Sequence, residues 1–178
     1  PNWISKNESL FWADQLYSRL NWKSPRVRLF GKEHYVPRET TFLAKENINY
    51  KYSGTIHYGF GFPSWFLPLL NRVNLFVDNE FNGCLLNLYR DGSDSMGWHS
   101  DNEPELNKQS NIASLSFGAT RDFALRNYHT SVKEILPLSN GDLLVMYPEC
   151  QDQWKHSLPK RTRVKEWRIN LTFRSYSV

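Results

Sequence analysis

Two residues with metal-ligand chemistry stand two positions apart in Trp98-His99-Ser100-Asp101. Side chains of an extended chain alternate between its faces, so His99 and Asp101 point the same way and Ser100 points the other. With one further histidine they would form the two-histidine, one-carboxylate set that binds iron(II) and leaves coordination positions open. His156 is the candidate third ligand. The alternative is a surface histidine beside a solvated aspartate, so this pattern needs support from elsewhere in the chain.

Support comes from residues 167–174 (WRINLTFR), where apolar and polar residues alternate strictly. Such a strand usually turns its polar face to water, but Arg168 and Arg174 are the residue type suited to bidentate carboxylate binding. Open positions on iron(II) accommodate a bidentate 2-oxo acid and dioxygen, and a dianionic 2-oxo acid needs cations nearby. The candidate residues for binding it are Asn87, Tyr89, Arg168, Asn170 and Arg174.

Composition indicates one domain, because 178 residues can bury a sizeable core but hardly two. The net charge of +4 and the pI of about 9.1 are compatible with a nucleic-acid partner without identifying one. Aromatic residues make up 15% of the chain, which fits base stacking or a ring-rich β core equally. Cys84 and Cys150 lack the spacing of a zinc site or a disulfide scaffold, so we expect a reducing, intracellular setting. No apolar run approaches the ~20 residues of a membrane span.

The elements that must position these residues begin with two predicted helices. One covers about residues 7–20, with Asn7 as N-cap and an apolar face built on Leu10, Phe11, Tyr17 and Leu20. The other covers 64–77, with an apolar face that we expect to be buried. The residues of that second face are Trp65, Leu69, Val73 and Phe76.

From Gly83 onward the pattern is one of short strands and turns, which predicts a sandwich or jelly-roll body. The predicted strands cover 84–89, 112–118, 121–126, 143–147 and 167–174. In the first of them, Asn87 and Tyr89 share a face with Leu85.

Two N-terminal stretches present aromatic rings. Phe30 lies among cations at the tip of a predicted turn, where it is either a wedge for a base stack or a partly buried core residue. Tyr50 and Tyr52 share one face of a predicted strand, as a stacking wall for a planar ligand or as a half-buried sheet face.

Several segments together resemble the AlkB iron(II)/2-oxoglutarate dioxygenases, which repair alkylated bases. The matching segments are residues 87–92 (NLYRDG), 99–103 (HSDNE), 113–119 (ASLSFGA), 155–159 (KHSLP) and 168–174 (RINLTFR). The resemblance extends from about Val27 to Arg174. Residues 29–32 (LFGK), 36–38 (VPR) and 52–54 (YSG) make it most similar to the duplex-repairing subgroup, AlkB homologue two.

The resemblance implies a mainly β fold with flanking helices: a double-stranded β-helix (jelly roll) at about 81–178, with helices and a nucleotide-recognition lid at about 1–80, within the single domain 1–178. It implies iron(II) held by His99, Asp101 and His156. Arg168, Asn87 and Tyr89 would bind the distal carboxylate of 2-oxoglutarate, and Asn170 and Arg174 the proximal one. The implied substrate-binding residues are Phe30, Arg38, Tyr50, Tyr52, Ser53 and Glu103.

In the implied reaction, 2-oxoglutarate and O2 are consumed, a base such as 1-methyladenine or 3-methylcytosine is hydroxylated on its N-methyl group, and formaldehyde is released. Phe30 would fill the space left by the flipped base, Tyr52 would stack on that base, and Glu103 would accept from its exocyclic amine. Etheno adducts fit the same pocket. We expect a monomer acting on DNA, with RNA as an alternative, in the bacterial cytoplasm or nucleoid or in a eukaryotic nucleus.

Other readings of the same residues remain. A 2-oxoglutarate-dependent hydroxylase of a protein or small molecule would keep the iron ligands and arginines without needing Phe30, Tyr52 or Glu103. A nucleic-acid-binding jelly roll without catalysis would make the ligand set a coincidence. A hydrolytic zinc site would leave the paired arginines without a role.

Overall fold

The computed structural model describes residues 1–29, 31–52 and 55–177. Its body consists of two antiparallel sheets. In spatial order the larger sheet contains β11 (Leu143–Met146), β8 (Ile112–Gly118), β13 (Arg168–Arg174), β6 (Gly83–Tyr89) and β3 (Glu39–Ala44). The smaller sheet contains β10 (Lys133–Leu138), β9 (Arg121–Asn127), β12 (Trp154–Leu158) and β7 (Met96–His99). The predicted jelly-roll core is confirmed.

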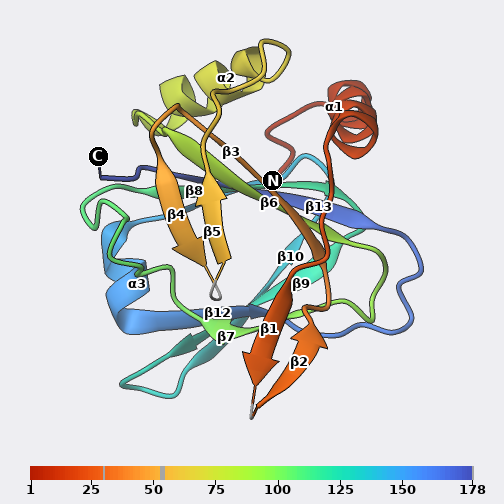
Figure 1. The fold of residues 1–178 in the computed structure, drawn as a ribbon. Helices are drawn as coiled ribbons and strands as arrows, with labels where there is room; N and C mark the ends of the chain where they lie inside the picture. The colour runs from red at the N-terminus through yellow and green to blue at the C-terminus, as the bar shows by residue number, and fades with distance from the viewer. Residues whose placement is uncertain (30, 53–54, 178) are drawn as a thin grey trace.

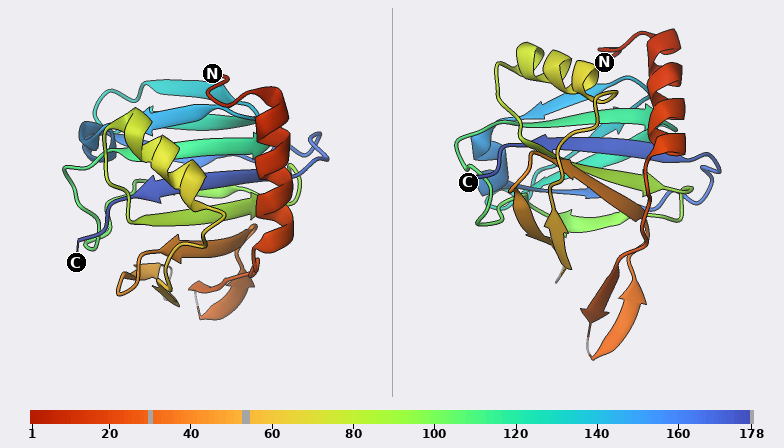
Figure 2. Two further views of the ribbon diagram at one scale, coloured as in Figure 1. Left: turned by 90° about the horizontal axis from the view of Figure 1, so that it is seen from above. Right: turned by 45° about the horizontal axis from the view of Figure 1, so that its top comes forward.

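The helices are α1 (Lys6–Arg19), α2 (Leu67–Val77) and the short α3 (Pro148–Gln153). Figure 2 shows α1 and α2 lying across the same face of the larger sheet. Buried side chains of both helices, such as Leu16 and Val73, form one apolar cluster with Ile169, Leu171 and Phe173 of β13. The apolar face of β13 is therefore covered by helices, and its polar face is left to point between the sheets.

The helix predictions need two corrections. α1 begins after Ser5, whose side chain accepts from the backbone N–H of Glu8, so Asn7 is not the N-cap. Its buried face contains Trp12, Ala13 and Leu16, whereas Leu10, Phe11 and Tyr17 are about half exposed. In α2 the prediction of a buried Phe76 is wrong, because its side chain is 61% exposed and its ring packs edge-on against Trp3.

Two hairpins leave the body on the side away from these helices (Figure 1). One is formed by β1 (Arg26–Leu29) and β2 (Lys32–Tyr35), and the other by β4 (Asn49–Tyr52) and β5 (Thr55–Tyr58). Between them in sequence, β3 pairs with β6 as an edge strand of the larger sheet. The N-terminal residues thus supply both the projecting hairpins and part of the jelly roll. In the part of the chain described, helices are too short or too polar to cross a membrane.

Candidate active site

His99 and His156 come from neighbouring strands of the smaller sheet. They are paired residues in the register of β7 and β12, and their ring centroids lie 4.2 Å apart. His156 is buried and its ring stacks on Phe123 of β9 at 5.2 Å, whereas His99 is half-buried. The two imidazoles that the sequence pattern singled out, 57 positions apart along the chain, therefore meet between the sheets.

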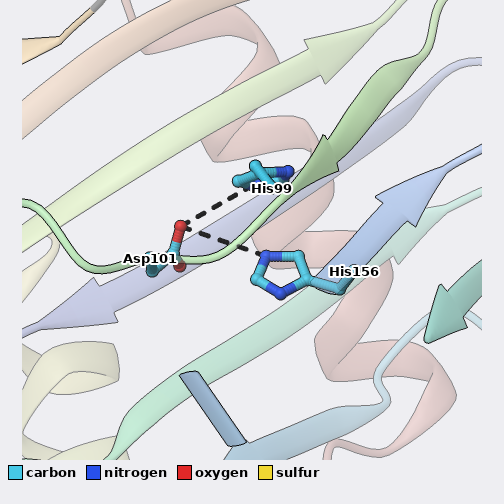
Figure 3. Close-up of side chains that lie close together, drawn as sticks. All are labelled: His99, Asp101 and His156. Atoms are coloured by element: carbon cyan, nitrogen blue, oxygen red, sulfur yellow. Dashed lines mark ion pairs between the residues drawn. The ribbon is translucent and has the colours of Figure 1, made fainter. Parts of the chain in front are cut away.

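Asp101 completes the group from the loop that follows β7. Its Oδ1 lies 3.6 Å from His99 Nε2 and 3.9 Å from His156 Nε2 (Figure 3). One ligand atom of each residue lies within 4.8 Å of the other two. Among the described residues Asp101 Oδ1 has no hydrogen-bond partner although it is buried, which is the state expected of an atom that a metal ion would satisfy.

The histidine ring orientations suit metal binding. His99 Nδ1 lies 2.9 Å from the carbonyl oxygen of Gly97. Because a carbonyl can only accept, Nδ1 carries the proton and the Nε2 lone pair is directed toward Asp101. Such an outer contact fixes the tautomer of a ligating histidine.

The charges of the group also suit a metal ion. Burial lowers the pKa of His156 to about 4, so the imidazole is neutral and free to coordinate near pH 7. Burial alone would raise the pKa of Asp101, but Arg174 and the two imidazoles hold it at about 2, so the carboxylate is ionised. Two imidazoles and one carboxylate form the donor set that suits iron(II) with open coordination positions.

The lowered pKa of His156 predicts an acid sensitivity of the metal-free protein. The unfolded chain takes up a proton near pH 6.5 and the folded protein does so only near pH 4, so stability falls as pH is lowered through this window. The full effect is about 3 kcal/mol at the conversion of 1.4 kcal/mol per pKa unit. Urea unfolding of metal-free protein from pH 7 to 4 should show the slope, and His156→Asn should remove most of it. An equally steep slope in the variant would contradict the assignment.

Arg168 lies at one end of the polar face of β13 and is 1% exposed. Its Nη2 donates to Ser116 Oγ at 2.9 Å and to Asn170 Oδ1 at 3.0 Å, and its guanidinium carbon lies 5.7 Å from the centre of the Tyr89 ring. Burial lowers the pKa of Arg168 to about 10, so the side chain stays charged at neutral pH. No carboxylate among the described residues pairs with it, and its Nε has no partner there. A buried cation in this state is suited to an anionic ligand.

Arg174 lies at the other end of the same face, also buried. Its Nη2 is 2.7 Å from Asp101 Oδ2. Burial tends to lower the pKa of Arg174, but the Asp101 carboxylate raises it well above its usual value. The AlkB resemblance implies that Arg174 binds the proximal carboxylate of 2-oxoglutarate, and the contact that the structure shows is with the carboxylate of Asp101.

The remaining residues predicted for 2-oxoglutarate lie on the same wall. Asn170 Oδ1 accepts from Ser114 Oγ at 2.9 Å as well as from Arg168, and its Nδ2 donates to Thr172. The amide of Asn170 therefore orients Arg168. The cavity between the sheets has about 510 Å3 of empty space, including its opening to solvent. Its lining includes Asn87, Tyr89, His99, Asp101, Ser114, His156, Arg168, Asn170, Thr172 and Arg174.

The predicted substrate residues are only partly placed. Tyr50 is buried and its hydroxyl donates to Glu103 Oε1 at 2.9 Å, while Glu103 Oε2 is buried without a partner among the described residues. Arg38 is also buried, and its Nε donates to Asn87 Oδ1 at 2.8 Å, which places it beside one of the residues predicted to bind 2-oxoglutarate. Phe30, Ser53 and the side chain of Tyr52 lie outside the described residues.

Sequence reasoning missed some residues of this site. Ser114 and Ser116 alternate with apolar residues along β8 and are paired in register with Thr172 and Asn170 on the polar face of β13. This alternation is the sequence signal that could have indicated them. Gln151 of α3 contacts the loop that carries Asp101, and no sequence pattern indicates it.

A comparison with family models places the whole site within a known family. The model of the 2OG-Fe(II) oxygenase superfamily matches residues 1–174. The chain belongs to this superfamily. The name of this family refers to iron(II) and 2-oxoglutarate, and in this chain His99, Asp101 and His156 are placed so that they could form the iron site.

Relatives of this oxygenase include proteins named for AlkB. It is 40% identical over 162 residues to human "DNA oxidative demethylase ALKBH2", covering 84% of this chain and 60% of that protein. It is 43% identical over 188 residues to bovine "Alpha-ketoglutarate-dependent dioxygenase alkB homolog 3", covering 98% and 64%. These matches confirm the AlkB resemblance. This oxygenase thus spans roughly three fifths of the length of these relatives.

Solved structures agree on the fold. An oxidoreductase of the 2OG-Fe(II) oxygenase family from Burkholderia pseudomallei gives a TM-score of 0.65 at 16% identity, covering 98% of this chain and 81% of that one. The structure of OsALKBH1 gives 0.56 at 17% identity, covering 85% and 80%.

Proposed function

We propose that this oxygenase removes alkyl groups oxidatively from bases in DNA, with N-methylated bases such as 1-methyladenine and 3-methylcytosine as substrates. The observation that carries the proposal is the placement of the His99–Asp101–His156 triad and the buried, carboxylate-free Arg168 on the walls of one cavity. The AlkB-named relatives add the substrate class, since one of them is named a DNA demethylase. DNA as partner, an intracellular site of action and a monomeric state are parts of the same proposal.

The residues of the triad fit iron(II), as the unpaired buried oxygen of Asp101 and the neutral imidazole of His156 indicate. Bound there, iron(II) supplies the centre at which O2 oxidises both 2-oxoglutarate, to succinate and CO2, and the N-alkyl carbon, which leaves as formaldehyde. In our proposal Arg168 binds the distal carboxylate of 2-oxoglutarate through its fork of N–H donors. Asn170 and Ser116 hold this fork in place, and Arg174 keeps Asp101 ionised and aimed at the imidazoles.

Base recognition is assigned to the Tyr50–Glu103 pair. The hydroxyl of Tyr50 occupies one oxygen of Glu103 and leaves Oε2 to accept from the exocyclic amine of an extruded base. A cationic methylated base gains further from a carboxylate nearby, and it is cheaper to extrude than an intact paired base. We propose Tyr52 and Ser53 as further base contacts and Arg38 as the residue that orients Asn87.

The experiment is a lesion panel. Oligonucleotides carrying 1-methyladenine, 3-methylcytosine or an etheno adduct, single-stranded and duplex, are incubated with iron(II) and with or without 2-oxoglutarate, and the products are read by mass spectrometry. With the two methylated bases we expect restored bases and equimolar formaldehyde and succinate only with 2-oxoglutarate; the etheno adduct would release its two carbons as a dialdehyde in place of formaldehyde. His99→Ala should give none of these products. Succinate release that methylated oligonucleotides do not stimulate would reject the DNA substrate and favour a protein or small-molecule hydroxylase.

The variant Phe30→Ala tests how the protein enters duplex DNA. We propose that Phe30 fills the stack vacated by the extruded base, so Phe30→Ala is expected to lower turnover about tenfold on duplex substrates and less than twofold on single strands, which have no vacated position to fill. Turnover of one 3-methylcytosine sequence in both forms provides the measurement, with Phe60→Ala, an exposed ring in the loop after β5, as the control. Equal losses on both forms would remove this role.

A further inference from the structure

The carboxylate ligand of the proposed metal site is not held by its own strand. β7 ends at His99, and Asp101 follows in a stretch without regular backbone pairing. Residues in loops are in general more mobile than those in the strands they follow. Arg174 contacts the carboxylate itself, with Nη2 2.7 Å from Oδ2. Because metal binding and catalysis tolerate only about 0.5 Å of freedom, the backbone of this loop must be positioned as well.

Two side-chain contacts join the loop to the segment that carries the other buried ligand. Gln151 of α3 accepts a hydrogen bond from the backbone N–H of Asp101 through its Oε1 at 2.8 Å. Ser100 Oγ lies 2.9 Å from the carbonyl oxygen of Trp154, the first residue of β12. Trp154 is two positions before His156, so both contacts reach the chain just ahead of that ligand. We call them the loop contacts.

Each loop contact is itself held in place. The carbonyl of Trp154 can only accept, so Ser100 donates its proton there, and the hydroxyl of Tyr128 at 2.9 Å donates to Ser100. The second end of the Gln151 amide, Nε2, lies 3.7 Å from the sulfur of Met146 on β11. The amide is thereby fixed with its oxygen toward Asp101.

We propose that Ser100 and Gln151 are positioning residues for the carboxylate ligand: through the loop contacts they fix Asp101 relative to His156, so that the three ligand atoms are assembled before a metal ion arrives. The alternation of side chains along residues 99–101 explains how Ser100 can make this contact. Ser100, between His99 and Asp101, is not among the residues that line the cavity, and its hydroxyl contacts β12. This inference rests on the metal site of the proposed function.

The test measures metal binding rather than turnover. Cobalt(II) alone is titrated into metal-free protein and followed by calorimetry and by its visible absorption bands, which report coordination geometry. Ser100→Ala and Gln151→Ala are each expected to raise the dissociation constant about tenfold, the lower end of the effect of losing an outer contact to a ligand. Their unfolding midpoints without metal should stay within a few degrees of the parent protein.

Matched variants separate positioning from folding. Gln153→Ala, an exposed glutamine of the same helix, should leave cobalt affinity within twofold. Ser100→Thr and Gln151→Glu keep the donor and the acceptor and should recover affinity to within threefold. Unchanged affinity in both alanine variants would overturn the proposal, as would losses that follow a large drop in unfolding midpoint and are not recovered by the conservative variants. Failure of the metal site itself is distinct, because His99→Ala would then bind cobalt as tightly as the parent.

Discussion

Replacing His156 by alanine is expected to lower iron-dependent succinate release at least a hundredfold and to abolish measurable cobalt binding. Of the two imidazoles His156 is the more buried, and it is held on one side by Phe123 and on the other by its register partner His99. Its Nε2 faces Asp101 Oδ1 at 3.9 Å. Without it, one imidazole and one carboxylate remain, which is too few protein ligands for this class of iron site.

Alanine at this position also leaves a cavity, so the loss must be separated from misfolding. His156→Gln fills more of that space and retains a neutral polar end, so it should fold with an unfolding midpoint closer to the parent while still failing to bind cobalt. His129→Ala, an exposed histidine between β9 and β10, serves as the control and should retain full activity. Iron-dependent succinate release by His156→Gln at the parent rate would refute the ligand assignment.

The sequence predicts the central strands of this fold well because each has one face against helices and one toward the cavity. β13 alternates without a break, and its apolar residues enter the main core as expected. The H-x-D spacing likewise predicts that His99 and Asp101 point together, since the alternation of an extended chain persists past the end of β7.

Prediction fails where burial depends on distant partners. The sequence prediction omits β10, because Pro137 interrupts its pattern. Proline is tolerated there because β10 is an edge strand of the smaller sheet. In α1 two apolar stripes compete, and only docking on the larger sheet selects the one containing Trp12 and Leu16. The pattern alone could not choose between them.

The same limit applies to the site. Composition and alternation predict that Arg174 faces the cavity, but not that its partner is Asp101, because that contact joins residues 73 positions apart through the tertiary fold. An arginine fork that suits the carboxylate of a ligand suits the carboxylate of a protein equally. Arg168 differs in lacking a protein carboxylate among the described residues, which is why it carries the strongest expectation for 2-oxoglutarate.

Arg168→Lys is accordingly expected to raise the KM for 2-oxoglutarate about a hundredfold. Lysine keeps the positive charge but loses the planar fork that pairs with both oxygens of a carboxylate. The contacts to Ser116 and Asn170 aim the guanidinium into the cavity, and a shorter-reaching point charge cannot use both. Succinate release against 2-oxoglutarate concentration gives the measurement, with Arg163→Lys in the exposed loop before β13 as the control.

A second variant tests whether the cost of burying Arg168 is offset by the ligand. Burial lowers the pKa of Arg168 to about 10, so the ligand-free protein bears the cost of an unneutralised cation at all pH values below this. Arg168→Met removes that charge, so it should lose 2-oxoglutarate binding yet unfold at a midpoint no lower than Arg168→Lys. In the parent, saturating 2-oxoglutarate should raise the midpoint by several degrees, and in Arg168→Met it should not. A thermal shift of the same size in both proteins would place the distal carboxylate elsewhere.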